Sequence, residues 1–119
     1  MNPRSLNTRD EEAKIQAAII KELRNLNWFV KETHGNMYQS GFPDLFCSHT
    51  RYGHRWLEVK KPVGYVFTPA QLETFPQLCA HGSNVWIATT HVDVEAVLMR
   101  PPNWFMFLQV ASSHRGPRS

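Results

Sequence analysis

The sequence predicts an α/β domain in which helices flank a single mixed sheet. Apolar residues recur at helical spacing near the N-terminus, over 9–26. Three short segments, 28–33, 44–48 and 55–60, then have strand-like patterns and are separated by turn residues. A second capped helix and a continuous apolar strand follow, which gives the order α-β-β-β-α-β before a further short helix. This alternation is typical of an α/β fold.

Length and composition limit the classes of protein that this chain can represent. Its 119 residues, 42% of them hydrophobic and 19% charged, are enough for one domain with a core. A formal net charge of +3 fits a polyanionic partner without requiring one. No apolar run approaches the ~20 residues that span a membrane, and no signal-peptide core is present, so we expect a cytoplasmic protein without membrane association. We expect Cys47 and Cys79 to be buried free thiols.

The first helix is predicted over 9–26. The segment Thr-Arg-Asp-Glu at 8–11 resembles a capping box, so residues 1–8 are expected to be an irregular lead-in. Glu12 falls on the same helical stripe as the apolar positions, which directs its carboxylate toward the sheet. Glu11 is the competing acid, although the capping box already accounts for it. The apolar residues of the stripe are Ile15, Ala18, Ile19, Leu23 and Leu26.

Turn and cap patterns predict the second half of the domain. The segment Thr-Pro-Ala-Gln at 68–71 combines a helix cap, a proline in the first turn and a glutamine at the third position, and His81 with Gly82 ends this helix. The apolar run 85–89 predicts a central strand, and a short helix is expected over 92–99. Residues 1–111 therefore form one domain, followed by a basic, disordered tail at 112–119. The inner face of the second helix is expected to contain Leu72, Phe75, Leu78 and Cys79.

Two neighbouring segments carry the clearest chemical pattern. Gly-Phe-Pro-Asp at 41–44 opens an apolar strand, and Glu58 and Lys60 share one face of the next strand. If the strands pair as a hairpin, Asp44, Glu58 and Lys60 converge at one end of the sheet. Two carboxylates in a small volume repel one another unless a cation joins them, and hard oxygen ligands suit Mg²⁺ or Mn²⁺. A lysine beside them can hold a phosphate or an attacking water, so the pattern predicts a metal-dependent phosphodiesterase site.

Several of these residues have simpler explanations. Asp44 can cap a turn while Glu58 and Lys60 form a solvated strand face, and Gln71 can act only as the third residue of a capping box. The serine before Gly41 can meet a phosphate or simply hydrogen-bond within its loop. Scattered basic side chains are usual on a protein surface, so only some of them are expected to contact DNA phosphates. The possible phosphate-binding residues are Ser40, Lys61, Arg51, Arg55, Lys31 and Arg24.

Other site classes are not supported by the motifs. The six histidines and two cysteines lack the spacing of a structural zinc site. No His-Asn-His set fits an HNH-type nuclease, and no Walker-type glycine loop indicates a nucleotide cofactor.

Four blocks in order, at 12–16, 41–45, 57–60 and 68–71, resemble the VRR-NUC family, a branch of the PD-(D/E)xK nuclease superfamily found in phage and bacterial proteins and in a eukaryotic repair nuclease. The resemblance covers residues 9–90. It implies a restriction-endonuclease-like fold, Mg²⁺- or Mn²⁺-dependent hydrolysis of branched DNA, and a homodimer in the cytoplasm of a bacterial or phage-infected cell. It also implies the roles of individual residues. Asp44, Glu58 and the Val59 carbonyl would be metal ligands, Lys60 the catalytic lysine, Glu12 the helix acid that completes the metal site, and Gln71 the glutamine that supports it.

The function and assembly implied by this resemblance have alternatives. A Holliday-junction resolvase is the first expectation, a flap, repair or restriction-type nuclease the second, and a non-catalytic DNA-binding module the third. Paired acids facing a polyanion argue against a pure binding module. The run 104–108 is too apolar for a free tail, so it either packs on the edge of the sheet or forms a subunit interface.

Overall fold

The computed structural model describes the backbone of residues 3–33 and 40–113, and the side chains of 10–33 and 40–108. One four-stranded sheet has the order β1-β2-β3-β4, in which β1 to β3 pair antiparallel and β3 pairs parallel with β4. The predicted mixed α/β fold is therefore confirmed. None of the helices in the described ranges is long and apolar enough to cross a membrane. The elements are α1 (Pro3–Asn25), β1 (Phe29–Glu32), β2 (Leu45–His49), β3 (Gly53–Val59), α2 (Pro69–Ala80), β4 (Val85–Ala88), α3 (Val94–Leu98) and α4 (Trp104–Ser113).

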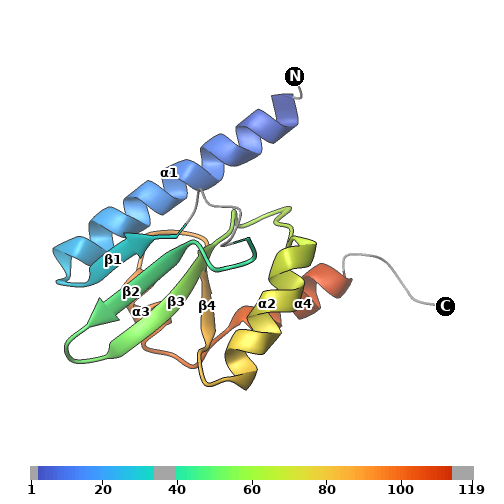
Figure 1. Ribbon diagram of the computed structural model, residues 1–119. Coiled ribbons are helices and arrows are strands. Elements are labelled where there is room, and N and C mark those ends of the chain that lie inside the picture. The colour runs from blue at the N-terminus through green and yellow to red at the C-terminus, as the bar shows by residue number, and fades with distance from the viewer. Residues whose placement is uncertain (1–2, 34–39, 114–119) are drawn as a thin grey trace.

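One face of the sheet is closed by α1 and α3, and Figure 1 shows α1 lying along it. Alternate residues of the strands point to this face, because side chains in a strand flip with period two. They pack against Ile19 and Leu23 of α1, which are both fully buried. The strand and α3 residues of this core are Val30, Leu45, Cys47, Leu57, Val59, Trp86, Ala88, Val94 and Leu98.

The start of α1 differs from the prediction. The helix begins at Pro3, a position where proline is well tolerated, so Thr8 lies inside the helix and the expected capping box is wrong. The end is near its predicted place. Asn27 adopts φ +71°, and the N–H of Trp28 donates to the carbonyl of Leu23 at 2.9 Å, which is a Schellman cap. Leu26 lies beyond the helix and is 36% exposed, not buried.

The other face of the sheet is covered by α2 and α4 at its β4 end. A second core there joins Phe75 of α2 and Trp104 of α4 to Val85 and Ile87 of β4. All four residues of β4 are buried, yet β4 is an edge strand of the described sheet and not a central one. The apolar pattern of β4 is continuous because helices cover both faces of the strand. From the sequence alone, such a strand cannot be distinguished from a central strand that pairs on both edges.

The helices of the second half follow the cap and turn patterns closely. The α2 capping box is present, with Thr68 at the cap and Gln71 at the third position. Leu72 is exposed rather than on the inner face, while Cys79 is a half-buried free thiol that accepts a hydrogen bond from the Trp104 indole at 3.1 Å. The run 104–108 is the start of α4, which continues to Ser113; residues 114–119 of the expected tail lie outside the described residues.

The loop before β2 is pressed against the first turns of α2. Gly41 has φ +87°, and a Cβ atom there would lie 2.5 Å from the Ala70 carbonyl oxygen and 2.7 Å from Oγ1 of Thr74. The hydroxyl of Thr33 donates to the Pro43 carbonyl, and the Thr33 N–H donates to the carbonyl of Asp44 at 3.0 Å. The loop is therefore fixed on both sides immediately before Asp44.

Gly41→Ala should destabilise the protein more than Gly82→Ala does. Both glycines have a similar positive φ, but a Cβ at Gly82 meets nothing within 4 Å. Strain of the backbone alone costs about 1–2 kcal/mol, which is the expected effect at Gly82. The clash with the Ala70 carbonyl adds to this at Gly41, so we expect a further loss of about 2 kcal/mol. Thermal unfolding of the two variants measures the difference; equal losses would show that the loop is not pressed against α2.

Candidate metal-dependent nuclease site

The β2–β3 hairpin places two acids side by side. Leu45 pairs with Leu57, so Asp44, one residue before β2, lies opposite Glu58. The backbone N–H of Asp44 donates to Oε1 of Glu58 at 3.1 Å, and the N–H of Val59 donates to Oδ2 of Asp44 at 2.8 Å. Each carboxylate is thus held by the backbone of the other strand.

Glu58 and Lys60 point toward α2 and not into solvent. They are 3% and 4% exposed, respectively, and Lys60 Nζ lies 3.1 Å from Oε2 of Glu58. The simpler explanation, a solvated strand face, is therefore wrong for these two residues. The alternation of side chains along this strand was predicted correctly, but only the position of α2 shows that the face with Glu58 and Lys60 is covered.

Gln71 joins the cap of α2 to the acids. Its Oε1 accepts the Thr68 backbone N–H at 3.0 Å, as a capping box requires. The same oxygen accepts a hydrogen bond from Lys60 Nζ at 3.0 Å, and Nε2 of Gln71 donates to Oε2 of Glu58 at 2.7 Å. The capping role and the contact with the acids therefore coexist in one side chain, which is 8% exposed.

The Lys60 ammonium group has all three of its donors engaged. It donates to the Val66 carbonyl at 2.7 Å and to Gln71 at 3.0 Å, and it pairs with Glu58. The ammonium also lies 4.9 Å from the ring centre of Phe67, at cation–π distance. Direct contact between Lys60 and a phosphate would require it to exchange one of these partners.

The pKa values of both carboxyl groups are raised by burial. Burial, and then the charge of Asp44, raise the pKa of Glu58 to about 8, while Lys60 and Gln71 oppose the shift. Burial is also the main cause that raises the pKa of Asp44, against the hydrogen bond from the Val59 N–H. A pair of buried acids with raised pKa values is stabilised by a positive charge, which is what a bound cation provides.

Glu12 lies near this pair and Glu11 does not. Oε2 of Glu12 accepts the backbone N–H of Lys61 at 3.3 Å, and its charge contributes to the raised pKa of Asp44. Glu11 is exposed. Glu12 and Asp44 also line a cavity of about 980 Å³ that extends along α1 to Asn25.

The donor atoms around Asp44 and Glu58 fit a hard divalent cation. No three His, Cys, Asp or Glu side chains within the described ranges form a group that could hold a metal ion. An ion would therefore depend on the two carboxylates, on backbone oxygen and on water. The N–H and C=O of one strand residue point to the same edge, so the Val59 carbonyl faces Asp44, as its N–H does. Such an all-oxygen set suits Mg²⁺ or Mn²⁺.

The predicted phosphate-binding residues are not gathered at this site. Arg55 packs 4.8 Å from the ring centre of Trp86 and donates to the carbonyl of Leu98 at 3.0 Å, so it has a structural role in the fold. Arg51 is exposed in the turn between β2 and β3, at the far end of the hairpin. Ser40 is exposed in the loop before Gly41.

The other three predicted cations come from different parts of the fold. Lys61 follows Lys60 directly and is half-buried. Arg24 lines the α1 cavity and donates to the Val30 carbonyl at 3.0 Å. Lys31 is exposed on β1.

Two partners of Lys60 were not predicted from the sequence. The Val66 carbonyl and the Phe67 ring contact its ammonium because the chain between β3 and α2 turns back over the site. Every residue has a backbone carbonyl, so no sequence pattern could predict that the Val66 carbonyl accepts a hydrogen bond from Lys60. Phe67 directly precedes the cap Thr68, in the position from which a hydrophobic residue often packs onto its helix.

Comparisons with known proteins identify the fold. A scan with protein-family models found no match, and neither did a search of curated proteins. Among solved structures, one described as "VRR_NUC domain" is 23% identical with a TM-score of 0.64, covering 76% of this chain and 97% of that one. Another, "VRR_NUC domain protein", is 20% identical with a TM-score of 0.58, covering 74% and 84%. The chain thus has the restriction-endonuclease-like fold of VRR_NUC domains.

The stability of the metal-free protein should depend on pH through Glu58. Its pKa in the folded state is about 8 against an ordinary value of 4.5, so the folded state binds more protons between these values. The free energy of unfolding should therefore fall as pH rises from about 4.5 to about 8. Glu58→Gln removes this group. Over the same pH range, the free energy of unfolding of Glu58→Gln should therefore fall less than that of the wild-type protein. We expect the difference to be at least ~1 kcal/mol, or about 4 °C in Tm.

Thermal melts of the protein and of Glu58→Gln in a chelator, at several pH values, test this expectation. Glu22→Gln on α1 is a matched control that changes a glutamate outside the site. Parallel pH profiles for the wild-type protein and Glu58→Gln would contradict the raised pKa of Glu58.

Proposed function

We propose that this chain is a metal-dependent DNA endonuclease of the VRR-NUC family. The observation that carries the proposal is the convergence of Asp44, Glu58, Lys60 and Gln71 at one end of the sheet. In a chain with the fold of solved VRR_NUC domains, these residues occupy the blocks that resemble the family.

The residues divide the work of phosphodiester hydrolysis. Mg²⁺ or Mn²⁺, held by Asp44, Glu58 and the Val59 carbonyl, would supply a positive charge for the phosphate and a bound water of lowered pKa. Gln71 orients Glu58 by donating to Oε2. Lys60 balances the charge of the acids and, on exchanging one acceptor, stabilises negative charge on the reacting phosphate. Glu12 lines the same cavity as Asp44 and adds a third acid beside the proposed metal ligands.

Branched DNA is the proposed substrate, with a Holliday junction as the first expectation. The alternative is a flap, repair or restriction-type nuclease with the same site. A non-catalytic DNA-binding module is the less favoured candidate, since a binder of a polyanion gains nothing from two buried acids with raised pKa values. A panel of labelled four-way junctions, flaps and plain duplexes with Mg²⁺ distinguishes the three.

Asp44→Asn, Glu58→Gln and Lys60→Ala should each lower Mg²⁺-dependent cleavage by on the order of 100-fold or more. The two acid variants should keep or slightly gain thermal stability in a chelator, because each relieves repulsion between the carboxylates. Cleavage of labelled DNA at saturating Mg²⁺, with melting curves of each variant, measures both effects. Full activity of purified Asp44→Asn would reject the metal site.

Glu12→Gln and Glu11→Gln form a matched pair for the same assay. Glu12 lines the same cavity as Asp44 and Glu11 is exposed, so only Glu12→Gln should impair cleavage or weaken metal affinity. The reverse outcome would place the wrong acid of α1 at the site.

A homodimer is the proposed assembly for a junction-cutting enzyme. One domain carries one site, whereas resolution of a four-way junction takes two cuts on opposing strands, and a two-fold dimer supplies them. Trp104 packs on the sheet, so the first part of the run 104–108 belongs to the core. Phe105 and Met106 on the same helix are 49% and 65% exposed and offer an apolar surface to a second copy.

Light scattering at micromolar concentration should report about twice the 13.8 kDa mass of the chain. Met106→Glu should shift this mass toward the monomer, because it places a charge in the apolar surface. Affinity for a four-way junction should also fall steeply with salt. A monomeric wild-type protein that cuts flaps but not junctions would reject the resolvase and favour the flap nuclease.

A further inference from the structure

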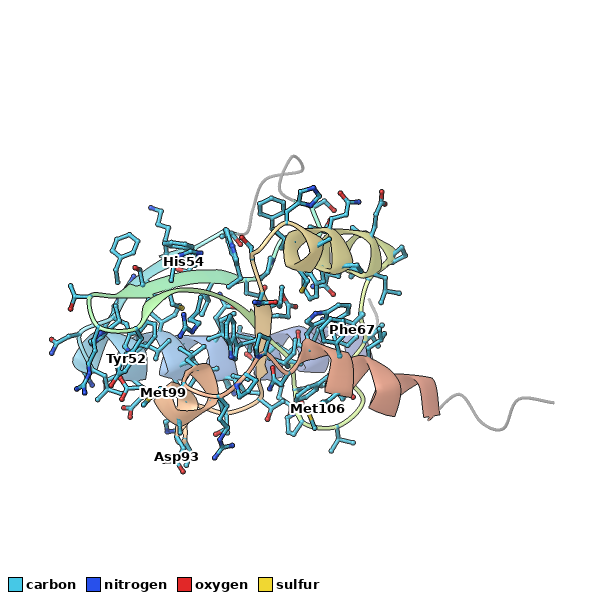
Figure 2. The ribbon with its side chains drawn as sticks, turned by 90° about the horizontal axis from the view of Figure 1, so that it is seen from below. Tyr52, His54, Phe67, Asp93, Met99 and Met106 are labelled. Carbon is cyan, nitrogen blue, oxygen red and sulfur yellow. The ribbon has the colours of Figure 1, made fainter. Side chains whose placement is uncertain are left out.

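The described helices leave half of one sheet face open. The side of the sheet opposite α1 and α3 is covered by α2 and α4 only toward β4, where the second core lies. In Figure 2, His54 stands on this open side, whereas Asp93 and Met99 lie on the opposite side of the sheet. Over β1 and β2, the described helices do not pack on the open face.

Five rings form a continuous row on this open face, which we call the aromatic platform. Phe46 is at its centre, with ring-centre distances of 6.4 Å to Phe29, 6.0 Å to His54 and 5.2 Å to Trp56. The His54 ring is inclined by only 20° to Phe46. Phe42 extends the row, 5.7 Å from Trp56. The rings come from β1, β2, β3 and the loop before β2.

The aromatic platform is more exposed than stabilisation of the sheet requires. Cross-strand aromatic pairs strengthen a sheet, and Phe46 and Trp56 are half-buried in this way. Phe29 and Phe42, however, are 59% and 39% exposed at the two ends of the row. Single exposed apolar residues are ordinary, but a contiguous exposed row is typical of a binding surface.

The aromatic platform runs directly into the acids. Trp56 and Glu58 alternate on β3 and Lys60 follows one residue after its end, so each lies about 7 Å from the next along the chain. Phe46 follows Asp44 by two residues. Lys31 pairs with Phe46 in the β1–β2 register and is exposed, which places a positive charge beside the central ring.

We propose that the aromatic platform binds the unpaired bases of a DNA strand by stacking, next to the Asp44 and Glu58 site. Every base has a π-face, so an aromatic row binds unpaired bases without regard to sequence, and a nearby cation contacts the backbone. In a duplex these faces are already stacked on neighbouring bases, so only an unpaired segment can use the platform. The inference rests on the proposed nuclease function for the choice of DNA, and it specifies a substrate with a single-stranded segment beside the cut.

Binding without cleavage tests this inference independently of catalysis. The full chain is titrated, in a chelator, into labelled oligothymidylate of about 12 nucleotides and into an abasic strand of the same length and charge. We expect the wild-type protein to bind oligothymidylate at least about fivefold more tightly, because the phosphates are matched and only the bases differ. Equal affinity for the two strands would overturn the proposal.

Variants locate the preference for bases. Phe29→Ser and Phe29→Leu should reduce it severalfold, and the leucine keeps an apolar side chain if the serine unfolds the edge strand. Met99→Ser, which removes a side chain of similar exposure (54%) from the opposite side, should leave it unchanged. A preference that survives both Phe29 variants overturns the proposal. The proposal is also overturned if the Phe29 variants change the mass measured by light scattering but keep the wild-type affinity for oligothymidylate. The row would then be an interface between copies of the chain.

Discussion

The burial of the Glu58 carboxyl group is the constraint on which the rest of this structure depends. A carboxyl group that is 3% exposed must find hydrogen-bond partners for both of its oxygens. The Asp44 backbone supplies one bond, and Gln71 and Lys60 supply the others. These donors lie on the loop before β2, on α2 and directly after β3, so three separate segments must meet around one side chain.

The surrounding features follow from that meeting point. Gly41 lets the loop approach the carbonyl of Ala70, because any Cβ there would clash with α2. Gln71 closes the cap of α2 and contacts Glu58 with the same side chain, so the helix cannot shift without releasing the acid. The chain before α2 turns back to give Lys60 its third acceptor, the Val66 carbonyl. The site is thereby held rigid while its two acids keep raised pKa values, an arrangement that a cation would stabilise.

The two faces of the sheet differ in a way that bears on the substrate. One face is sealed by α1 and α3 over an aliphatic core. The described helices cover the other only toward β4, and its open half is aromatic. The acids lie where the sealed and open halves meet, since Glu58 is under α2 and Trp56, two residues earlier, belongs to the aromatic row. A strand of DNA lying on the open half would lead directly to the proposed metal ligands.

The sequence by itself determined the class of fold, the order of its elements and the residues of the acidic pair, because strand alternation, cap residues and turn residues are local properties of the chain. Asp44, Glu58, Lys60 and Gln71 were all named from short patterns, and the structure brings them together. The start of α1 was predicted wrongly, because the residues at 8–11 resemble a capping box although they lie inside a longer helix. The edge position of β4, the structural role of Arg55 and the contact of Val66 with Lys60 were decided by tertiary structure alone. Each depends on which distant segment packs against a residue, and this cannot be predicted from the residue's neighbours in the sequence.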